Sequence, residues 1–302
     1  MQTRRAFLGT LGALAAGCAS THLPREGILD THTHFYDPTR PQGVPWPAKD
    51  DEFLYRKVMP EEFEQMVKPL GVTGTIVVEA SSWVDDNEWI LDLAKSNRII
   101  KGLVGHLKPG KANFARDLNR FAANPLFCGI RVGLWDIPLA PNDLDLLSDL
   151  RLLARRGLAL DVLGGPSEIV KITRLASAIP ELRIVVDHSA GVRVTGKAPD
   201  SKWVEGIKSL ASRRNIYMKV SELVEGTGMA SAPTEVDFYR PVLDVLWDAF
   251  GDERVLYGSN WPVSARFANY ATVLNIVREY MKSATAAERY FRLNAERLYL
   301  RG

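Results

Sequence analysis

"GILDTHTHF", residues 27–35, reads as a short buried β-strand whose carboxyl end carries polar side chains. Seven further runs are similarly short, rich in Val, Ile, Leu or Tyr, and bounded by Gly, Pro or Asn. They cover residues 73–81, 100–107, 127–135, 158–164, 183–190, 215–223 and 254–261. Near-continuous apolar runs are typical of strands buried on both faces of a parallel sheet.

Helical patterns separate these strands. They cover residues 60–71, 85–97, 142–157, 167–180, 201–214, 236–251 and 270–283. Strands that alternate with helices predict a (β/α)8 TIM barrel, as a single domain over residues 25–302. A doubly wound open sheet is the alternative, but no glycine-rich dinucleotide turn supports it. The proline-rich segment 36–59 is expected to lie over the barrel mouth, packed down by Trp46, Phe53 and Tyr55.

Composition is that of an ordinary globular enzyme or binding protein. Hydrophobic residues make up 46% of the chain, charged residues 25%, and the formal net charge is +2. Lysine and arginine are scattered along the sequence, which argues against a nucleic-acid surface. We therefore expect a small molecule as the binding partner, while the sequence leaves the oligomeric state open.

Residues 1–20 differ from the rest and predict an export signal. Arg4 and Arg5 precede a short apolar run from Leu8 to Ala16, which resembles a twin-arginine signal peptide and is too short to span a bilayer. The stretch before Cys18 resembles a lipobox, which predicts either a periplasmic lipoprotein anchored at Cys18 or a soluble periplasmic protein cut nearby. Without Cys18, Cys128 is the one cysteine left, so no internal disulfide is expected, and we interpret Cys128 as a small core residue.

Histidines gather at the ends of the predicted strands. His32 and His34 are two residues apart, so in a strand both point to one face. His188 ends the sixth strand and is expected at the same mouth, whereas Asp187 is expected to point toward the helices as a structural residue. His106 ends the third strand and could also face the mouth, but the direction of its side chain is less certain. Imidazoles so placed suit a divalent metal or a developing oxyanion.

Other polar side chains are predicted along the same rim, and each needs a partner or a role because a barrel core favours aliphatic residues. They are Glu79, Arg131, Asp161, Lys219, Glu222 and Asn260, from strands two, four, five, seven and eight. The guanidinium of Arg131 matches a substrate carboxylate or a lactone oxygen. An internal salt bridge with Glu79 or Asp161 is its alternative role.

The chain resembles the amidohydrolase superfamily, in the amidohydrolase 2 group of TIM-barrel hydrolases. The matching pieces are "DTHTHF", "GIRVGLW", "VVDHSAG", "NIYMKVSEL", "RVLYGSNWPV" and "NAERLYL", in order along nearly the whole chain. The group includes sugar lactonases, pyrone dicarboxylate lactonases and some decarboxylases. The resemblance implies that His32, His34 and His188 bind a divalent metal, with zinc favoured, or polarise a carbonyl directly in metal-independent members. It also implies that Arg131 binds substrate, with Lys219 and Glu79 expected beside it.

Asn260 occupies the position where the resemblance implies a water-activating aspartate. A neutral amide cannot accept a proton. Either Glu222, Glu79 or a histidine replaces the base, or Asn260 positions a water that a metal activates, or the site only binds. We therefore expect lactone hydrolysis, with His32, His34, His188, Glu222 and Asn260 as catalytic residues. A nonoxidative decarboxylase and a catalytically weakened binding protein are the alternatives.

Overall fold

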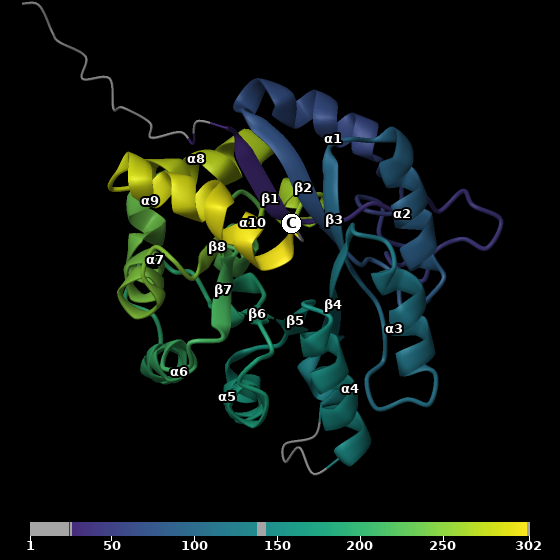
Figure 1. Ribbon diagram of the computed structural model, residues 1–302. Coiled ribbons are helices and arrows are strands. Elements are labelled where there is room, and N and C mark those ends of the chain that lie inside the picture. The colour runs from purple at the N-terminus through teal and green to yellow at the C-terminus, as the bar shows by residue number, and fades with distance from the viewer. Residues whose placement is uncertain (1–23, 25, 138–142, 301–302) are drawn as a thin grey trace, which may run out of the picture.

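The computed structural model describes residues 24, 26–137 and 143–300. Its sheet contains eight strands in sequence order, all parallel: β1 Ile28–Thr33, β2 Val72–Val78, β3 Ile100–Gly105, β4 Phe127–Gly133, β5 Ala159–Leu163, β6 Ile184–Val186, β7 Ile216–Val220 and β8 Val255–Tyr257. The main helices are α1 Pro60–Val67, α2 Asp86–Ser96, α3 Phe114–Ala122, α4 Leu144–Arg155, α5 Ile169–Ala178, α6 Ser201–Ala211, α7 Val236–Phe250 and α8 Tyr270–Tyr280. Two short helices follow, α9 Ala284–Glu288 and α10 Asn294–Tyr299. The helices surround the strands, which confirms the predicted (β/α)8 barrel (Figure 1).

The segment after β8 closes the barrel against β1. A parallel bridge joins Thr33 to Trp261, and the backbone N–H of Asn260 donates to the carbonyl of His32 at 2.9 Å. These contacts hold the carboxyl end of β1 next to the segment that follows β8. The closure therefore positions Asn260 directly beside the histidines of β1.

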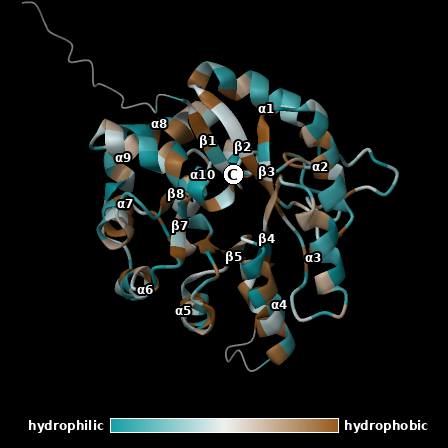
Figure 2. Cartoon of the chain, in the orientation of Figure 1, coloured by the Kyte–Doolittle hydropathy of each residue, from teal (hydrophilic) through white to brown (hydrophobic). Residues whose placement is uncertain are grey.

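Two hydrophobic layers stabilise the barrel. The larger lies between the strands and the helices, while a smaller cluster fills the barrel interior and includes Leu298 and Tyr299 of α10. Figure 2 shows hydrophobic residues on the strands, while the surrounding helices carry both hydrophobic and hydrophilic stretches. The interior cluster includes the strand starts Leu29 and Ala159, so α10 covers the amino-terminal end of the barrel. The opposite end is left for the site.

All eight strands are shorter than predicted, and β6 and β8 are the two that fall below half of their predicted length. β6 ends at Val186, so Asp187 and His188 lie beyond it, and β8 ends at Tyr257, three residues before Asn260. His188 and Asn260 have φ values of 57° and 59°. Backbones in this left-handed region leave the extended strand, so side chains there no longer alternate between two faces.

The segment 36–59 packs on the barrel mouth in part as expected. The Trp46 ring lies 5.7 Å from His34 and 5.3 Å from Tyr36, between ring centroids. Phe53, in contrast, is 41% exposed, so the expectation that it packs the segment down was wrong. Its ring instead lies under the guanidinium of Arg266, which also pairs with Asp51.

The remaining predictions concern the ends of the chain and its surface. Cys128 is buried in the barrel interior, as expected, and its thiol donates to the carbonyl of Leu103. The predicted signal segment, including Cys18, lies outside the described residues. Within the described part of the chain, no helix has the length and apolar character needed to cross a bilayer.

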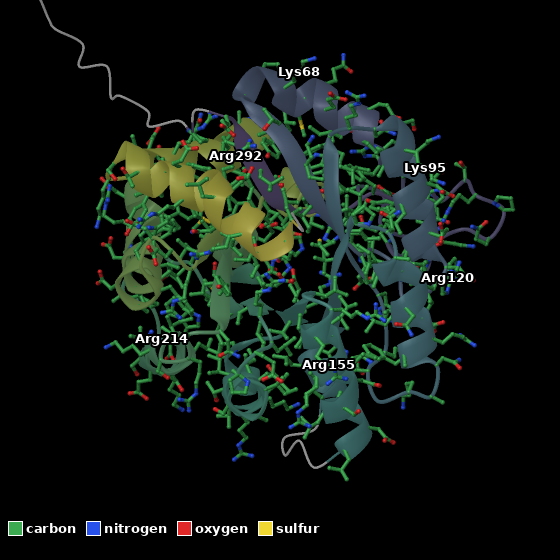
Figure 3. All side chains as sticks on the ribbon, viewed as in Figure 1. Lys68, Lys95, Arg120, Arg155, Arg214 and Arg292 are labelled. Atoms are coloured by element: carbon green, nitrogen blue, oxygen red, sulfur yellow. The ribbon has the colours of Figure 1, made fainter. Side chains whose placement is uncertain are left out.

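Basic residues are spread over the surface. Figure 3 labels six of them, which lie on separate parts of the outer layer: Lys68, Lys95, Arg120, Arg155, Arg214 and Arg292.

Candidate active site

β1 places two imidazoles at the mouth of the barrel. His32 is fully buried and His34 almost so, with ring centroids 5.1 Å apart. The Nδ1 of His34 lies 2.9 Å from the carbonyl oxygen of Val78. A carbonyl can only accept, so Nδ1 carries the hydrogen and Nε2 keeps its lone pair. Burial, followed by the Arg131 charge, lowers the pKa of His34 to about 3, so the ring is neutral at pH 7.

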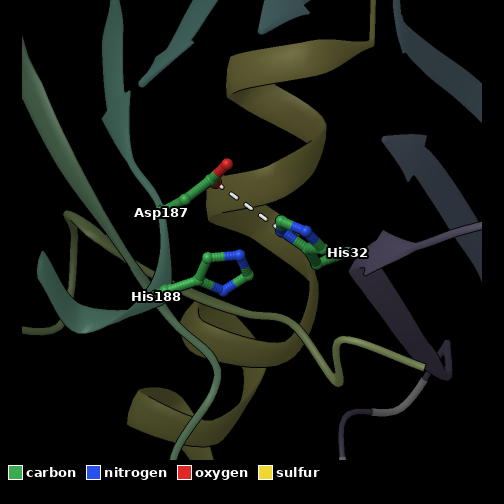
Figure 4. Close-up of side chains that lie close together, drawn as sticks. All are labelled: His32, Asp187 and His188. Carbon is green, nitrogen blue, oxygen red and sulfur yellow. Dashed lines mark ion pairs between the residues drawn. The ribbon is translucent and has the colours of Figure 1, made fainter. Parts of the chain in front are cut away.

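The turn after β6 brings Asp187 and His188 against His32 (Figure 4). The rings of His32 and His188 are 4.5 Å apart, and the Nδ1 of His32 lies 3.6 Å from Oδ1 of Asp187. The expectation that Asp187 faces the helices was therefore wrong. It assumed that the strand alternation continues to His188, but β6 ends at Val186 and the chain turns before the histidine.

A buried ion network lies behind this turn. The ammonium of Lys219 is 2.6 Å from Asp161 and 3.0 Å from Asp187, and the Tyr299 hydroxyl donates to Asp161. Lys219 is completely buried. It does not line the cavity described below, so the structure contradicts its predicted role in substrate binding. We assign it to the charge balance of the interior instead, because an unpaired buried carboxylate is strongly destabilising.

This network has a clear electrostatic consequence. Burial alone raises the pKa of Asp187, but Lys219 and then His32 outweigh it and hold that pKa well below its usual range. Burial raises the pKa of Asp161 to about 6 despite the same lysine. At pH 7 two carboxylates thus share one ammonium. One negative charge remains beside two neutral imidazoles.

The donors fit a divalent metal. His32, Asp187 and His188 each offer one ligand atom, and these atoms lie within 4.8 Å of one another. Among the described residues, both ring nitrogens of His32 and both oxygens of Asp187 are buried without a hydrogen bond of normal geometry. Burial keeps both imidazoles neutral, with the pKa of His188 lowered to about 4. Neutral imidazoles and one carboxylate are ligands that zinc accepts. Asp187 therefore takes the place in this cluster that we had expected for His34.

Glu222 and Asn260 approach His188 and His34 from β7 and β8. The Oε2 of Glu222 lies 3.6 Å from Nδ1 of His188, which also lies 3.0 Å from the Ser221 hydroxyl. Burial, reinforced by the charge of Asp187, raises the pKa of Glu222 to about 7. Its side chain is 40% exposed. The carboxylate is thus both close to His188 and reachable from solvent.

Glu225 holds the side chain of Asn260. The amide nitrogen of Asn260 donates to Oε1 of Glu225 at 2.9 Å, so the amide oxygen is the atom that remains as an acceptor, next to His34. Burial raises the pKa of Glu225 to about 8. Sequence reasoning missed this residue, because it lies in the loop after β7 and no strand or motif marks it.

Arg131 lies on the opposite wall, at the end of β4. Its Nε donates to Oε1 of Glu79 at 3.0 Å, and its Nη2 donates to the Glu79 carbonyl at 2.7 Å. The salt bridge with Glu79 is therefore present, and the one with Asp161 is not, because Asp161 is paired with Lys219. Contact of Arg131 with substrate therefore falls to Nη1 and to the second N–H of Nη2.

One cavity of about 450 Å³ joins the two walls. We call it the reaction cavity. Its lining includes His34, His188, Glu222, Asn260, Arg131, Glu79, Trp46 and Trp135. This volume is within the range of about 300–1,000 Å³ that is typical of small-molecule sites. Most of the predicted site residues therefore meet around one space, while His32 and Asp187 lie beneath it and Lys219 lies deeper.

His106 is absent from the lining of the reaction cavity. It lines a neighbouring cavity, where its backbone N–H donates to Asn87 at 2.8 Å. Burial lowers its pKa to about 4. The sequence left the direction of the His106 side chain open. It did not mark Trp135, which lines both cavities, as a site residue.

The comparisons with known proteins agree with this geometry. The amidohydrolase family model matches residues 29–301. An L-fucono-1,5-lactonase of Burkholderia ambifaria is 28% identical over 82% of this chain and 85% of its own length.

Solved structures share the fold. A crystal structure of a Burkholderia multivorans amidohydrolase with bound zinc has a TM-score of 0.77 at 23% identity, over 90% of this chain and 98% of its own. A manganese-bound dihydroxybenzoic acid decarboxylase of a Polaromonas species has a TM-score of 0.60 at 13% identity, over 90% and 96%. The family match spans almost all of the described residues and includes every strand of the barrel. The chain therefore belongs to the amidohydrolase family.

Proposed function

We propose that this protein is a lactonase, which opens a cyclic ester by attack of water on the ring carbonyl. One observation carries the proposal: the reaction cavity has hydrolytic groups on one wall and a guanidinium on the other. His34, His188, Glu222 and Asn260 form the first wall, and Arg131 belongs to the second. The likeness to an L-fucono-1,5-lactonase supports a sugar lactone as the substrate class.

Glu222 is the group that takes the proton from water. It is the carboxylate on the hydrolytic wall, so it can take the proton from the attacking water and return it to the ring oxygen as the bond between that oxygen and the carbonyl carbon breaks. Asn260 cannot act as a base, but its amide oxygen can accept a hydrogen bond from the same water. The two residues then divide the work, with Asn260 orienting the water and Glu222 deprotonating it.

The electrophilic side of the reaction belongs to the histidines. A divalent cation held by His32, Asp187 and His188 would act as a Lewis acid toward the carbonyl oxygen. Arg131 would hold the substrate through Nη1 and Nη2, while Glu79 fixes the plane of its guanidinium. Trp46 covers the cavity beside His34 and limits the entry of bulk water.

Hydrolysis of a lactone panel by the purified protein tests the proposal. The protein is assayed as isolated, after chelation, and after reloading with Zn²⁺ or Mn²⁺, with acid release followed above the spontaneous rate. We expect turnover of sugar 1,5-lactones that falls on chelation and returns with metal. Absence of turnover in every metal form would contradict the proposal. Release of CO₂ from a dihydroxybenzoate, without lactone turnover, would assign the site to decarboxylation instead.

A further inference from the structure

A second cavity continues from the reaction cavity toward the ends of β3 and β4. Its volume is about 500 Å³. The two cavities share the residues Glu79, Ser82, Arg131, Trp135 and Leu163. We call this second cavity the distal lobe. A substrate that reacts at His188 can therefore extend past Arg131 without leaving the protein.

Trp135 stands at the junction as a rigid aromatic wall. Trp135 is 67% exposed, which is unusual for so large an apolar residue. The neighbouring Leu134 is fully buried, and its carbonyl accepts a hydrogen bond from Lys171 at 2.7 Å. A Cβ on Gly133 would clash with the indole of Trp135, so the ring lies against a position that only glycine allows. The exposed face is thus held in place before any ligand arrives.

The distal lobe is also lined by a polar group that lacks a protein partner among the described residues. Among the described residues, Nε2 of His106 is buried without a hydrogen bond. Asn87 fixes the backbone of His106 on both sides, because it accepts from the N–H and donates to the carbonyl. The imidazole is neutral at pH 7, as its pKa shows. It can therefore serve a hydroxyl group either as donor or as acceptor.

The charges around the distal lobe are balanced. Lys108 and Lys111 line it, and so do Asp136 and Asp143. Glu79 already neutralises the charge of Arg131 through their salt bridge. A lobe with no net charge, one flat aromatic face and a neutral hydrogen-bonding group matches a pyranose ring, which has an apolar face and a hydroxyl edge. It does not match a phosphate or a carboxylate, which would need an excess of positive charge.

We propose that the distal lobe is a sugar subsite, so that the preferred substrates are lactones that carry a second, glycosyl ring. The indole of Trp135 stacks on that ring and His106 hydrogen-bonds its hydroxyls. This inference rests on the proposed lactonase function for the ring that is hydrolysed. The binding of the second ring in the distal lobe does not depend on that function.

The test compares two lactones that differ by one ring, glucono-1,5-lactone and cellobiono-1,5-lactone. The wild-type protein should show a higher kcat/KM for the two-ring lactone. Trp135→Ala should lower the ratio of the two kcat/KM values by about five- to tenfold, the effect of losing one aromatic contact, and Trp135→Phe should keep most of it. Trp83→Ala is the matched control, because Trp83 is also exposed but lines neither cavity. A wild-type preference for the one-ring lactone, or an equal loss for both substrates in Trp135→Ala, would overturn the subsite.

A binding measurement separates the failure of this inference from the failure of the lactonase function. Isothermal titration with cellobionate and with gluconate needs no turnover. Saturable binding of cellobionate that is lost in Trp135→Ala and kept in Trp83→Ala supports the subsite, even if no lactone is hydrolysed. Equal affinity for the two acids, or no binding of cellobionate, would overturn it even if lactones are hydrolysed.

Discussion

The two halves of the barrel mouth are built in different ways. Every described non-glycine residue with a left-handed backbone follows β6, β7 or β8: His188, Ser189, Ala190, Glu222 and Asn260. The half formed by β2 to β5 has none among its described residues. Each such residue costs roughly 1–3 kcal/mol, so the strain is concentrated where His188, Glu222 and Asn260 converge. The β2 to β5 half instead provides space, lined by Arg131, His106 and Trp135.

This contrast assigns different tasks to the two halves. The strained half turns side chains into positions that a regular strand cannot reach, and it contains Glu222 and Glu225, whose pKa values burial raises to about 7 and about 8. The open half has regular strand ends and two adjoining cavities. The difference suggests that the chemistry depends on the turns after β6 to β8, whereas the choice of substrate depends on β3 and β4. The predictions below test that division.

Loss of the histidine and aspartate cluster should have the largest effect. His188→Asn and Asp187→Asn should each lower kcat by roughly 10³-fold or more, because several kcal/mol of carbonyl polarisation are removed. Elemental analysis should find about one divalent metal per wild-type chain and much less in both variants. His106→Asn is the matched control for metal content. Equal metal content in all four proteins would show that the cluster of His32, Asp187 and His188 does not bind the metal.

Removal of the proposed base should have the next largest effect. Glu222→Gln keeps the shape of the side chain but cannot take a proton, so kcat should fall by about 10²-fold, within the usual range for a lost general base. Steady-state kinetics on a lactone should show KM changed far less than kcat. Glu235→Gln, on an exposed loop, is the matched control. A decrease in kcat of less than about fivefold would mean that another group accepts the proton.

Replacement of Asn260 by aspartate should lower the activity unless Glu225 is replaced as well. Asn260→Asp places a second carboxylate against Oε1 of Glu225, which now accepts from Asn260 at 2.9 Å. Two buried carboxyl groups at that distance share one proton, so a carboxylate at position 260 would be held by Glu225 instead of accepting a proton from water. We expect the single variant to lose about tenfold in kcat/KM, and Asn260→Asp combined with Glu225→Gln to recover or exceed the wild-type value. If the single variant is already faster than wild type, Glu225 does not constrain this position.

The smallest expected effect concerns stability and pH. Burial raises the pKa of Glu225 from 4.5 to about 8. Its stabilising contribution is therefore complete below pH 4.5 and is lost as the pH rises through about 8. Glu225→Gln keeps the hydrogen bond to Asn260 but removes the titration. Its melting temperature, relative to wild type, should thus rise between pH 5 and pH 9. A constant difference across this range would show that Glu225 does not titrate between these limits.

The fold could be predicted from the sequence because each strand carries its own apolar signal. The site was only partly accessible, because it depends on where strands stop. Asp187 was misplaced for this reason: the chain leaves the strand at Val186, and no residue pattern marks that point. The position of Lys219 on β7 was expected, but its burial between Asp161 and Asp187 depends on contacts across the barrel. Glu225 reaches Asn260 from a loop, and such long-range pairs have no local signature.

A crystal structure of the Glu222→Gln variant with an unhydrolysed lactone tests the division of the mouth most directly. We predict that the lactone carbonyl lies against His188 and Gln at position 222, and that the rest of the molecule extends past Arg131 toward Trp135. A lactone bound with its carbonyl in the distal lobe, away from His188, would contradict the account.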